Sequence, residues 1–259
     1  MTRLRALLVD VGGTLVDDTS WPPPDRVCQL QLERLADAYG ETRPWFAAFV
    51  EHAFAGGAAG TYEQRTAERV AEFLIAQAAT PSEGEVERIC RAACLPMAGN
   101  VRLEDHAFEA LSGARRLGLR IGICSNTLWR GDEESRSDWA ALGFGDLFDA
   151  HVTSRSTGYE KPHPAIFQRC LVELGVEADA AAMLGDRPER DVLGASRLGI
   201  RTIWKRPPGF ADAPDPPDPS DPPHPAPDAT IDSLAELPAL LEAWARGGNT
   251  WPRIRVTEA

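Results

Sequence analysis

The stretch that decides the fold is LLVDVGGTL, residues 7–15. Three apolar residues lead into Asp10, and Gly12, Gly13 and a threonine follow shortly after it. A carboxylate at the end of a buried strand is costly unless something binds it. The pattern therefore predicts a first core strand that delivers Asp10 to a functional site, with a tight turn after it.

Four more short, mostly apolar runs have the pattern of strands covered on both faces. They span residues 119–126, 148–154, 180–186 and 200–205. Helical patterns alternate with them at 104–117, 133–142, 164–174 and 188–198. This alternation predicts an α/β fold, with a Rossmann-like parallel sheet between two layers of helices.

Residues 17–99 differ from the rest of the chain. They hold four amphipathic stretches, near 24–39, 43–56, 61–79 and 83–94, and no convincing strand. Prolines precede the first stretch and Gly40 follows it, as helix boundaries favour. We therefore expect an all-helical cap domain at 17–99, inserted into a core made of residues 1–16, 100–206 and 228–247.

The segment at residues 207–227 contains ten prolines and four aspartates in twenty-one positions. Proline cannot donate to a sheet ladder and the aspartates repel one another, which predicts an extended, flexible segment. A helix is expected within 231–248, followed by a weakly ordered tail.

Composition narrows the classes of partner. The formal net charge of −12 argues against nucleic acid and anionic membranes, because both reward clustered Lys and Arg. No apolar run is long enough to span a bilayer, and the N-terminus lacks a cleavage signal, so we expect a cytoplasmic protein. The five scattered cysteines suggest neither disulfides nor zinc. Oligomeric state is open.

The residues that could carry chemistry all stand where a strand ends. They are Asp10, Ser125, Lys161, Asp186 and Asp191. The carboxyl ends of parallel strands meet at one edge of the sheet, where ligands bind. Three carboxylates offer the hard oxygen ligands that Mg²⁺ prefers, and a lysine and a hydroxyl suit a phosphoryl group.

Four motifs in this order make the chain resemble the haloacid dehalogenase-like hydrolase superfamily, of the type with a C1 cap. They are DVGGTL at 10–15, ICSN at 123–126, KPHPAIF at 161–167 and GDRPERD at 185–191. Actin-like sugar kinases also carry a D-x-G-G-T hairpin. Here LVDDTSWPPP, residues 15–24, stops the second strand that such a hairpin needs.

The resemblance implies a role for each motif residue. Asp10 would be the nucleophile and Lys161 a catalytic residue that also binds substrate. Ser125 and Asn126 would bind the phosphoryl group of a small anionic, phosphorylated substrate. Mg²⁺ would be held by the side chains of Asp10, Asp186 and Asp191 and by the backbone carbonyl of Gly12. The alternative for Asp191 is a structural role, capping its helix or pairing with a neighbouring arginine.

Gly12 departs from the family pattern, because phosphatases of the superfamily have an acidic residue two positions after the nucleophile. Glycine keeps the carbonyl and removes the acid, and general acid–base catalysis contributes roughly 10²–10⁴-fold in rate. We expect a phosphoric monoester hydrolase acting through an aspartyl-phosphate with impaired acid–base catalysis, unless Asp17 or Asp18 supplies the acid. The alternatives are a non-catalytic protein that binds Mg²⁺ and a phosphorylated ligand, or a hydrolase of another bond such as carbon–halogen.

Overall fold

The computed structural model of the chain describes residues 3–42, 46, 47, 50, 83–207, 225–246, 254 and 255. The predicted cap helix at 61–79, most of the predicted helix at 43–56 and most of the proline-rich segment lie outside these residues. None of the helices in the described ranges has the length and apolarity that a bilayer-spanning segment needs.

In the described chain, parallel strands form one seven-stranded sheet with the order β3-β2-β1-β4-β5-β6-β7. The strands are β1 (Ala6–Val9), β2 (Arg120–Ser125), β3 (Ala150–Thr153), β4 (Ala181–Gly185), β5 (Arg201–Lys205), β6 (Ala229–Ile231) and β7 (Ile254–Arg255). The predicted Rossmann-like α/β fold is confirmed. Strands β2 and β3 lie on one side of β1, and β4 to β7 lie on the other side. The strand order therefore reverses at β1, and ligands bind at such topological switch points of parallel sheets.

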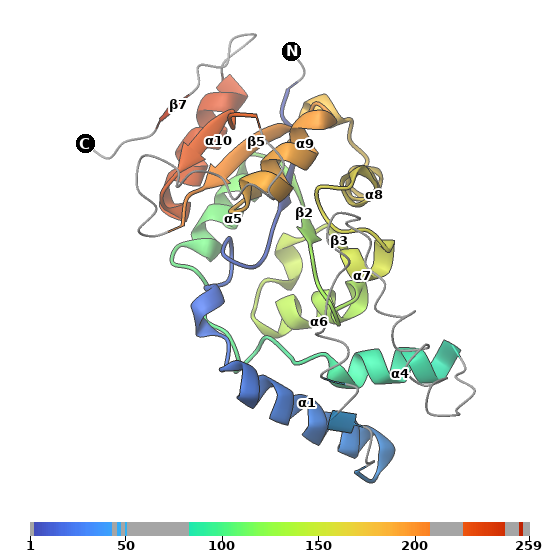
Figure 1. Ribbon diagram of the computed structural model, residues 1–259. Helices are drawn as coiled ribbons and strands as arrows, with labels where there is room; N and C mark the ends of the chain where they lie inside the picture. Colours follow the sequence, from blue (N-terminus) through green and yellow to red (C-terminus); the bar gives the residue numbers. More distant parts are fainter. Residues whose placement is uncertain are drawn as a thin grey trace.

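Helices cover both faces of the sheet (Figure 1). The α-helices are α1 (Pro24–Tyr39), α4 (Glu83–Ala93), α5 (Ala107–Arg116), α6 (Asp132–Ala141), α7 (Ser154–Thr157), α8 (Pro164–Leu174), α9 (Leu193–Arg197) and α10 (Leu237–Arg246). Short 3₁₀ turns occupy Asp18–Ser20, Gly145–Leu147, Ala178–Ala180 and Leu234–Glu236, and a π-helical turn occupies Pro188–Val192.

The two layers follow from the alternation of side chains along each strand. In β1, Leu7 and Val9 pack into one apolar cluster, which includes residues of α5, α6 and α10. Ala6 and Leu8 point to the other face and join a cluster with residues of α8 and α9. Every residue of β1 is therefore buried, which explains the unbroken apolar run before Asp10.

Helices α1 and α4 lie beside each other at one end of the molecule, apart from the sheet (Figure 1). Leu35 and Ile89 pack between them in a third apolar cluster. Two buried or half-buried side chains of α1 reach the last turn of α4: Gln31 Nε2 donates to Ala93 O at 2.9 Å, and Arg34 Nε donates to Ala92 O at 2.9 Å. The division into a cap at 17–99 and a core stays a prediction.

Most predicted elements within the described residues have close counterparts in the structure, but several differences occur, among them the short helix α7, which was not predicted. The helix predicted at 188–198 is divided into the π-helical turn and α9. The short strands β6 and β7 were not predicted, and β7 pairs with β6 beyond the predicted end of the core at residue 247.

Gly194 in α9 allows a close approach that matters for the site. A Cβ at this position would overlap the Phe167 ring and would stand 2.9 Å from the backbone Cα of Pro162. Pro162 follows Lys161 directly, and Gly194 lies three residues after Asp191. The glycine therefore lets the segments that carry Lys161 and Asp191 pack against each other.

We predict that Gly194→Ala lowers the free energy of unfolding by about 1–3 kcal/mol, because the added methyl group overpacks this contact. The measurement is urea or thermal unfolding. Gly84→Ala in α4 is the matched control, since nothing lies within 4 Å of the position that its Cβ would take, and it should be neutral or slightly stabilising. Equal stability of the two variants would contradict the role assigned to Gly194.

Candidate active site

The candidate site lies at the carboxyl ends of three adjacent strands, β2, β1 and β4. Asp10 directly follows β1, Ser125 ends β2, and Asp186 directly follows β4. The backbone N–H of Asp10 donates to Leu184 O of β4 at 2.9 Å, which extends the ladder to the edge. The sheet thus brings together side chains that are more than 170 residues apart in sequence.

The turn after Asp10 depends on its glycines. Gly13 has a φ of 66°, in the left-handed region that favours glycine, and a Cβ there would overlap the Asp186 carboxylate. Lys205 Nζ of β5 donates to Gly13 O at 2.8 Å and pairs with Glu104 at 3.2 Å. The turn is therefore held against the edge of the sheet while its backbone stays close to the carboxylates.

Lys161 joins two of the predicted site residues. Its Nζ donates to Asp10 Oδ1 at 2.7 Å and to Asp191 Oδ1 at 2.7 Å. All three side chains are buried, with Lys161 only 2% exposed. Burial alone lowers the pKa of Lys161, but the charges of Asp10 and Asp191 outweigh it and raise the pKa above its ordinary value. The amine is therefore charged at neutral pH.

Asp186 completes a cluster with the geometry of a metal site. One carboxylate oxygen from each of Asp10, Asp186 and Asp191 lies within 4.8 Å of the others. Asp186 Oδ1 is buried and accepts no hydrogen bond within the described part of the chain. Three carboxylates and one ammonium carry a formal charge of −2, and a buried excess of charge is costly. An oxygen-liganded divalent cation such as Mg²⁺ fits both observations.

Burial and mutual repulsion affect the titration of these carboxylates. Burial, with the charges of Asp10 and Asp191, raises the pKa of Asp186 to about 8, although Arg187 and Lys161 act in the opposite direction. Burial raises the pKa of Asp191 to about 6, and the ammonium of Lys161 limits the rise. The site without a cation therefore favours protons on its carboxylates.

Asp191 combines a structural contact with its place in the cluster. Its Oδ2 accepts a hydrogen bond from the backbone N–H of Arg187 at 3.0 Å, at the start of the π-helical turn. Its Oδ1 faces Lys161. The contact with Arg187 N is of the structural kind that the sequence left open, whereas the metal-binding role of Asp191 stays a prediction.

Asn126 lies beside the lysine rather than free in the site. Its Oδ1 accepts from the backbone N–H of Lys161 at 2.8 Å, and its Nδ2 donates to Lys161 O at 3.2 Å. The side chain predicted to bind substrate therefore holds the loop that carries Lys161. The neighbouring Ser125 is buried and lines the adjoining cavity, so its predicted place in the site is consistent with the geometry.

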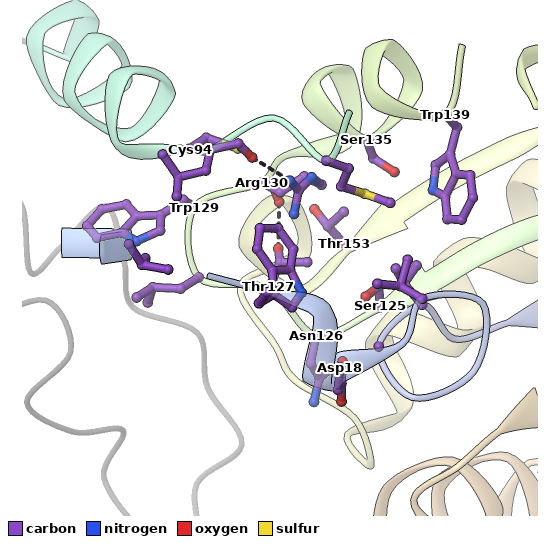
Figure 2. Close-up of a pocket in the computed structure, with 18 of the residues that line it drawn as sticks. Asp18, Cys94, Ser125, Asn126, Thr127, Trp129, Arg130, Ser135, Trp139 and Thr153 are labelled. Carbon is purple, nitrogen blue, oxygen red and sulfur yellow. Dashed lines mark hydrogen bonds between the residues drawn. The ribbon is translucent and has the colours of Figure 1, made fainter. Parts of the chain in front are cut away.

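A cavity of about 300 Å³ opens beside Gly12 and extends between the sheet edge and α1. Figure 2 shows Asp18, Ser125 and Asn126 toward one end of it and Trp129 and Cys94 toward the other. Much of the wall is apolar. The apolar residues that line it are Val11, Val16, Trp21, Val27, Leu95, Met97, Leu128, Trp129 and Trp139.

Asp17 and Asp18 differ sharply in their surroundings. Asp17 Oδ1 caps the following 3₁₀ turn by accepting from Thr19 N at 2.9 Å, and Oδ2 pairs with Arg102. Asp18 is exposed as a residue, but its carboxyl end approaches the Gly12–Gly13 turn. Desolvation there and the charge of Asp10 raise the pKa of Asp18, while Arg187 and the Gly13 N–H lower it. The sequence named both residues and could not choose between them.

Comparison with known proteins assigns the family. The family model for haloacid dehalogenase-like hydrolases matches residues 4–199. The chain belongs to this family, as the four motifs indicated. The C1 type of cap stays a prediction.

Several curated relatives that match part of the chain are phosphatases by name. Glyceraldehyde 3-phosphate phosphatase of Pyrococcus abyssi is 35% identical over 38% of this chain and 40% of its own length. Ribulose-1,5-bisphosphate 5-phosphatase of Halopiger xanaduensis is 32% identical over 52% of this chain and 55% of its own length. The chain therefore spans roughly half or less of each of these two relatives.

Solved structures match the fold over most of the chain. A haloacid dehalogenase-family phosphatase from Thermococcus onnurineus has 22% identity and a TM-score of 0.56, covering 92% of this chain and 98% of its own. A 2-haloacid dehalogenase from Pseudomonas syringae has 21% identity and a TM-score of 0.59, covering 93% and 100%. At this identity the likeness concerns the fold alone.

We predict that Mg²⁺ raises the melting temperature, and raises it more near pH 8 than near pH 5. The raised pKa values of Asp186 and Asp191 mean that the folded state binds more protons than the unfolded state, so stability falls as pH rises from about 4 to about 8. A bound cation offsets this loss by stabilising the deprotonated carboxylates. Thermal unfolding with and without Mg²⁺ at the two pH values measures the effect.

Asp186→Asn is the control for this measurement, because it removes the carboxylate with the unpartnered buried oxygen while preserving its shape. The variant should lose most of the Mg²⁺-dependent shift. A shift of wild-type size in Asp186→Asn would mean that the cation binds elsewhere.

Proposed function

We propose that this chain is a Mg²⁺-dependent hydrolase of phosphoric monoesters that acts through an aspartyl-phosphate on Asp10. The observation that carries the proposal is the buried Lys161 ammonium between Asp10 and Asp191, with the unpartnered oxygen of Asp186 beside them. The phosphatase names of the partial relatives support the same reaction.

Each residue has a part that follows from its position. An Asp10 oxygen attacks phosphorus, the bond to the leaving-group oxygen breaks, and water then hydrolyses the resulting acyl phosphate. Lys161 stays charged, holds Asp10 in place and offsets charge on the phosphoryl oxygens. Ser125 at the end of β2 donates to one of those oxygens from the cavity wall.

Mg²⁺ would be held by carboxylate oxygens of Asp10, Asp186 and Asp191, and the carbonyl of Gly12 stays a proposed fourth protein ligand. When bound, the cation supplies positive charge that favours the approach of a phosphate dianion to an anionic nucleophile. A small phosphorylated molecule is the proposed substrate.

The leaving group is proposed to be apolar. The cavity beside Gly12 leads from the site residues to a wall of tryptophan, leucine, methionine and valine side chains. Within it, Arg130 is already engaged, since its Nε donates to Asp138 Oδ2 at 2.6 Å and another nitrogen donates to Leu95 O at 2.7 Å. A sugar with several hydroxyl groups would lose hydrogen bonds to water on entering such a cavity, whereas an aromatic group would gain burial.

We predict that Asp10→Asn abolishes phosphate release, lowering kcat by on the order of 10³-fold or more, because the amide is a poor nucleophile. The assay is phosphate release from p-nitrophenyl phosphate with Mg²⁺, with an EDTA arm that should also be inactive. Asp146→Asn, an exposed carboxylate of the Gly145–Leu147 turn, is the control and should retain activity.

The same panel separates the alternatives. Wild-type turnover by Asp10→Asn would remove Asp10 from the mechanism. Release of halide from haloacids without phosphate release would favour carbon–halogen hydrolysis. Binding of Mg²⁺ and phosphate with no release of either product would favour a non-catalytic binding protein.

We also predict that benzyl phosphate is hydrolysed with a kcat/KM at least about tenfold above that of glycerol 3-phosphate. Both release a primary alkoxide, so the difference reports burial of the ring, which contributes on the order of 1.5–3 kcal/mol. A kcat/KM that favours glycerol 3-phosphate would show that the apolar wall does not receive the leaving group.

A further inference from the structure

One end of the cavity holds a carboxylate that has no part in the steps proposed above (Figure 2). Among the described residues that line the cavity, Asp18 is the only one with a carboxyl group. Its Oδ1 lies 2.7 Å from the position that a Cβ on Gly12 would occupy. The carboxylate of Asp18 therefore fills the space left open by the missing side chain of Gly12, which stands two residues after Asp10.

We propose that Asp18 is the general acid and base of the reaction. This inference rests on the proposed phosphatase function. In the first step its carboxyl group gives a proton to the leaving-group oxygen as the phosphorus–oxygen bond breaks and the Asp10–phosphorus bond forms. In the second step its carboxylate takes a proton from the water that attacks phosphorus, and Asp10 is released with inorganic phosphate. Each cycle returns the proton to Asp18.

The chemistry requires such a group for alkyl esters. An alkoxide is a strongly basic leaving group, and a positioned acid accelerates its departure by roughly 10²–10⁴-fold. A nitrophenolate leaves as a weak base and gains little from the proton. The dependence of rate on the leaving group therefore distinguishes an acid from a residue that merely supports the site.

Other groups near the cavity are poorly suited to this role. Asp17 is occupied by the 3₁₀ cap and by Arg102. Cys94 is buried, and burial raises its pKa to about 11. Arg130 is a permanent cation held by Asp138 and by Leu95 O. Within the described lining, Asp18 is thus the group that can both give and accept the proton.

The first test compares Asp18→Asn with Asp17→Asn on two substrates with aromatic groups, benzyl phosphate and p-nitrophenyl phosphate. For Asp18→Asn we expect kcat/KM to fall about 10²–10⁴-fold on benzyl phosphate and far less on p-nitrophenyl phosphate. Asp17→Asn, a neighbouring carboxylate outside the cavity lining, should change the two substrates equally. An equal loss on both substrates in Asp18→Asn, or no loss on benzyl phosphate, overturns the inference.

The second test moves the carboxylate. Gly12→Asp alone would bring its Cβ within 2.7 Å of Asp18 Oδ1, so the change is made together with Asp18→Ala. The double variant should recover hydrolysis of benzyl phosphate relative to Asp18→Ala, with little change on p-nitrophenyl phosphate. A folded double variant without selective recovery contradicts action from this position.

Failure of the proposed function is distinguishable from failure of this inference. If the wild-type protein with Mg²⁺ releases phosphate from neither substrate, the phosphatase proposal fails and Asp18 has no proton to transfer. If the wild-type protein hydrolyses both and Asp18→Asn shows no selective loss on benzyl phosphate, the phosphatase proposal stands and the role of Asp18 is refuted.

Discussion

The site depends on one buried ammonium group shared by two carboxylates. The charged ammonium of Lys161 tolerates burial because it donates hydrogen bonds to both Asp10 and Asp191, and each carboxylate offsets part of its desolvation. These residues come from three separate segments, so the pair of contacts fixes the β1 end, the loop before α8 and the π-helical turn relative to one another. The close packing at Gly194 and the hydrogen bonds between Asn126 and the Lys161 backbone hold these three segments in the same positions.

The sequence predicted the core of the fold because strong local patterns and simple topology agree there. Short apolar runs covered on both faces, alternating with amphipathic stretches, leave few arrangements other than a parallel sheet between helices. Helix α8 was predicted with its observed bounds because a proline and a glycine mark its two ends. Strands β6 and β7 were not predicted because β6 has three residues and β7 has two, too few to show a periodic pattern. Their pairing is set by long-range contacts.

Within the site, the sequence predicted which residues converge but not how they share their contacts. Asp10, Asp186 and Ser125 follow from strand ends, and topology alone places them at one edge. The hydrogen bonds between Asn126 and the backbone of Lys161 depend on the path of a loop 35 residues away in sequence, which no local pattern encodes. Which of Asp17 and Asp18 lines the cavity likewise depends on how the turn after β1 folds back, and no local pattern determines that path.

That folded-back turn has an evolutionary consequence. In this chain, the proposed nucleophile Asp10 directly follows a buried strand, while Asp18 stands on the exposed connection to α1. The two positions answer to different constraints: one is fixed by the interior of the sheet, and the other by a surface turn that tolerates substitution far more readily. Mutation can therefore alter the polarity of the cavity at Asp18 while leaving Asp10 and Lys161 untouched, which opens a route to new reactions on an unchanged core.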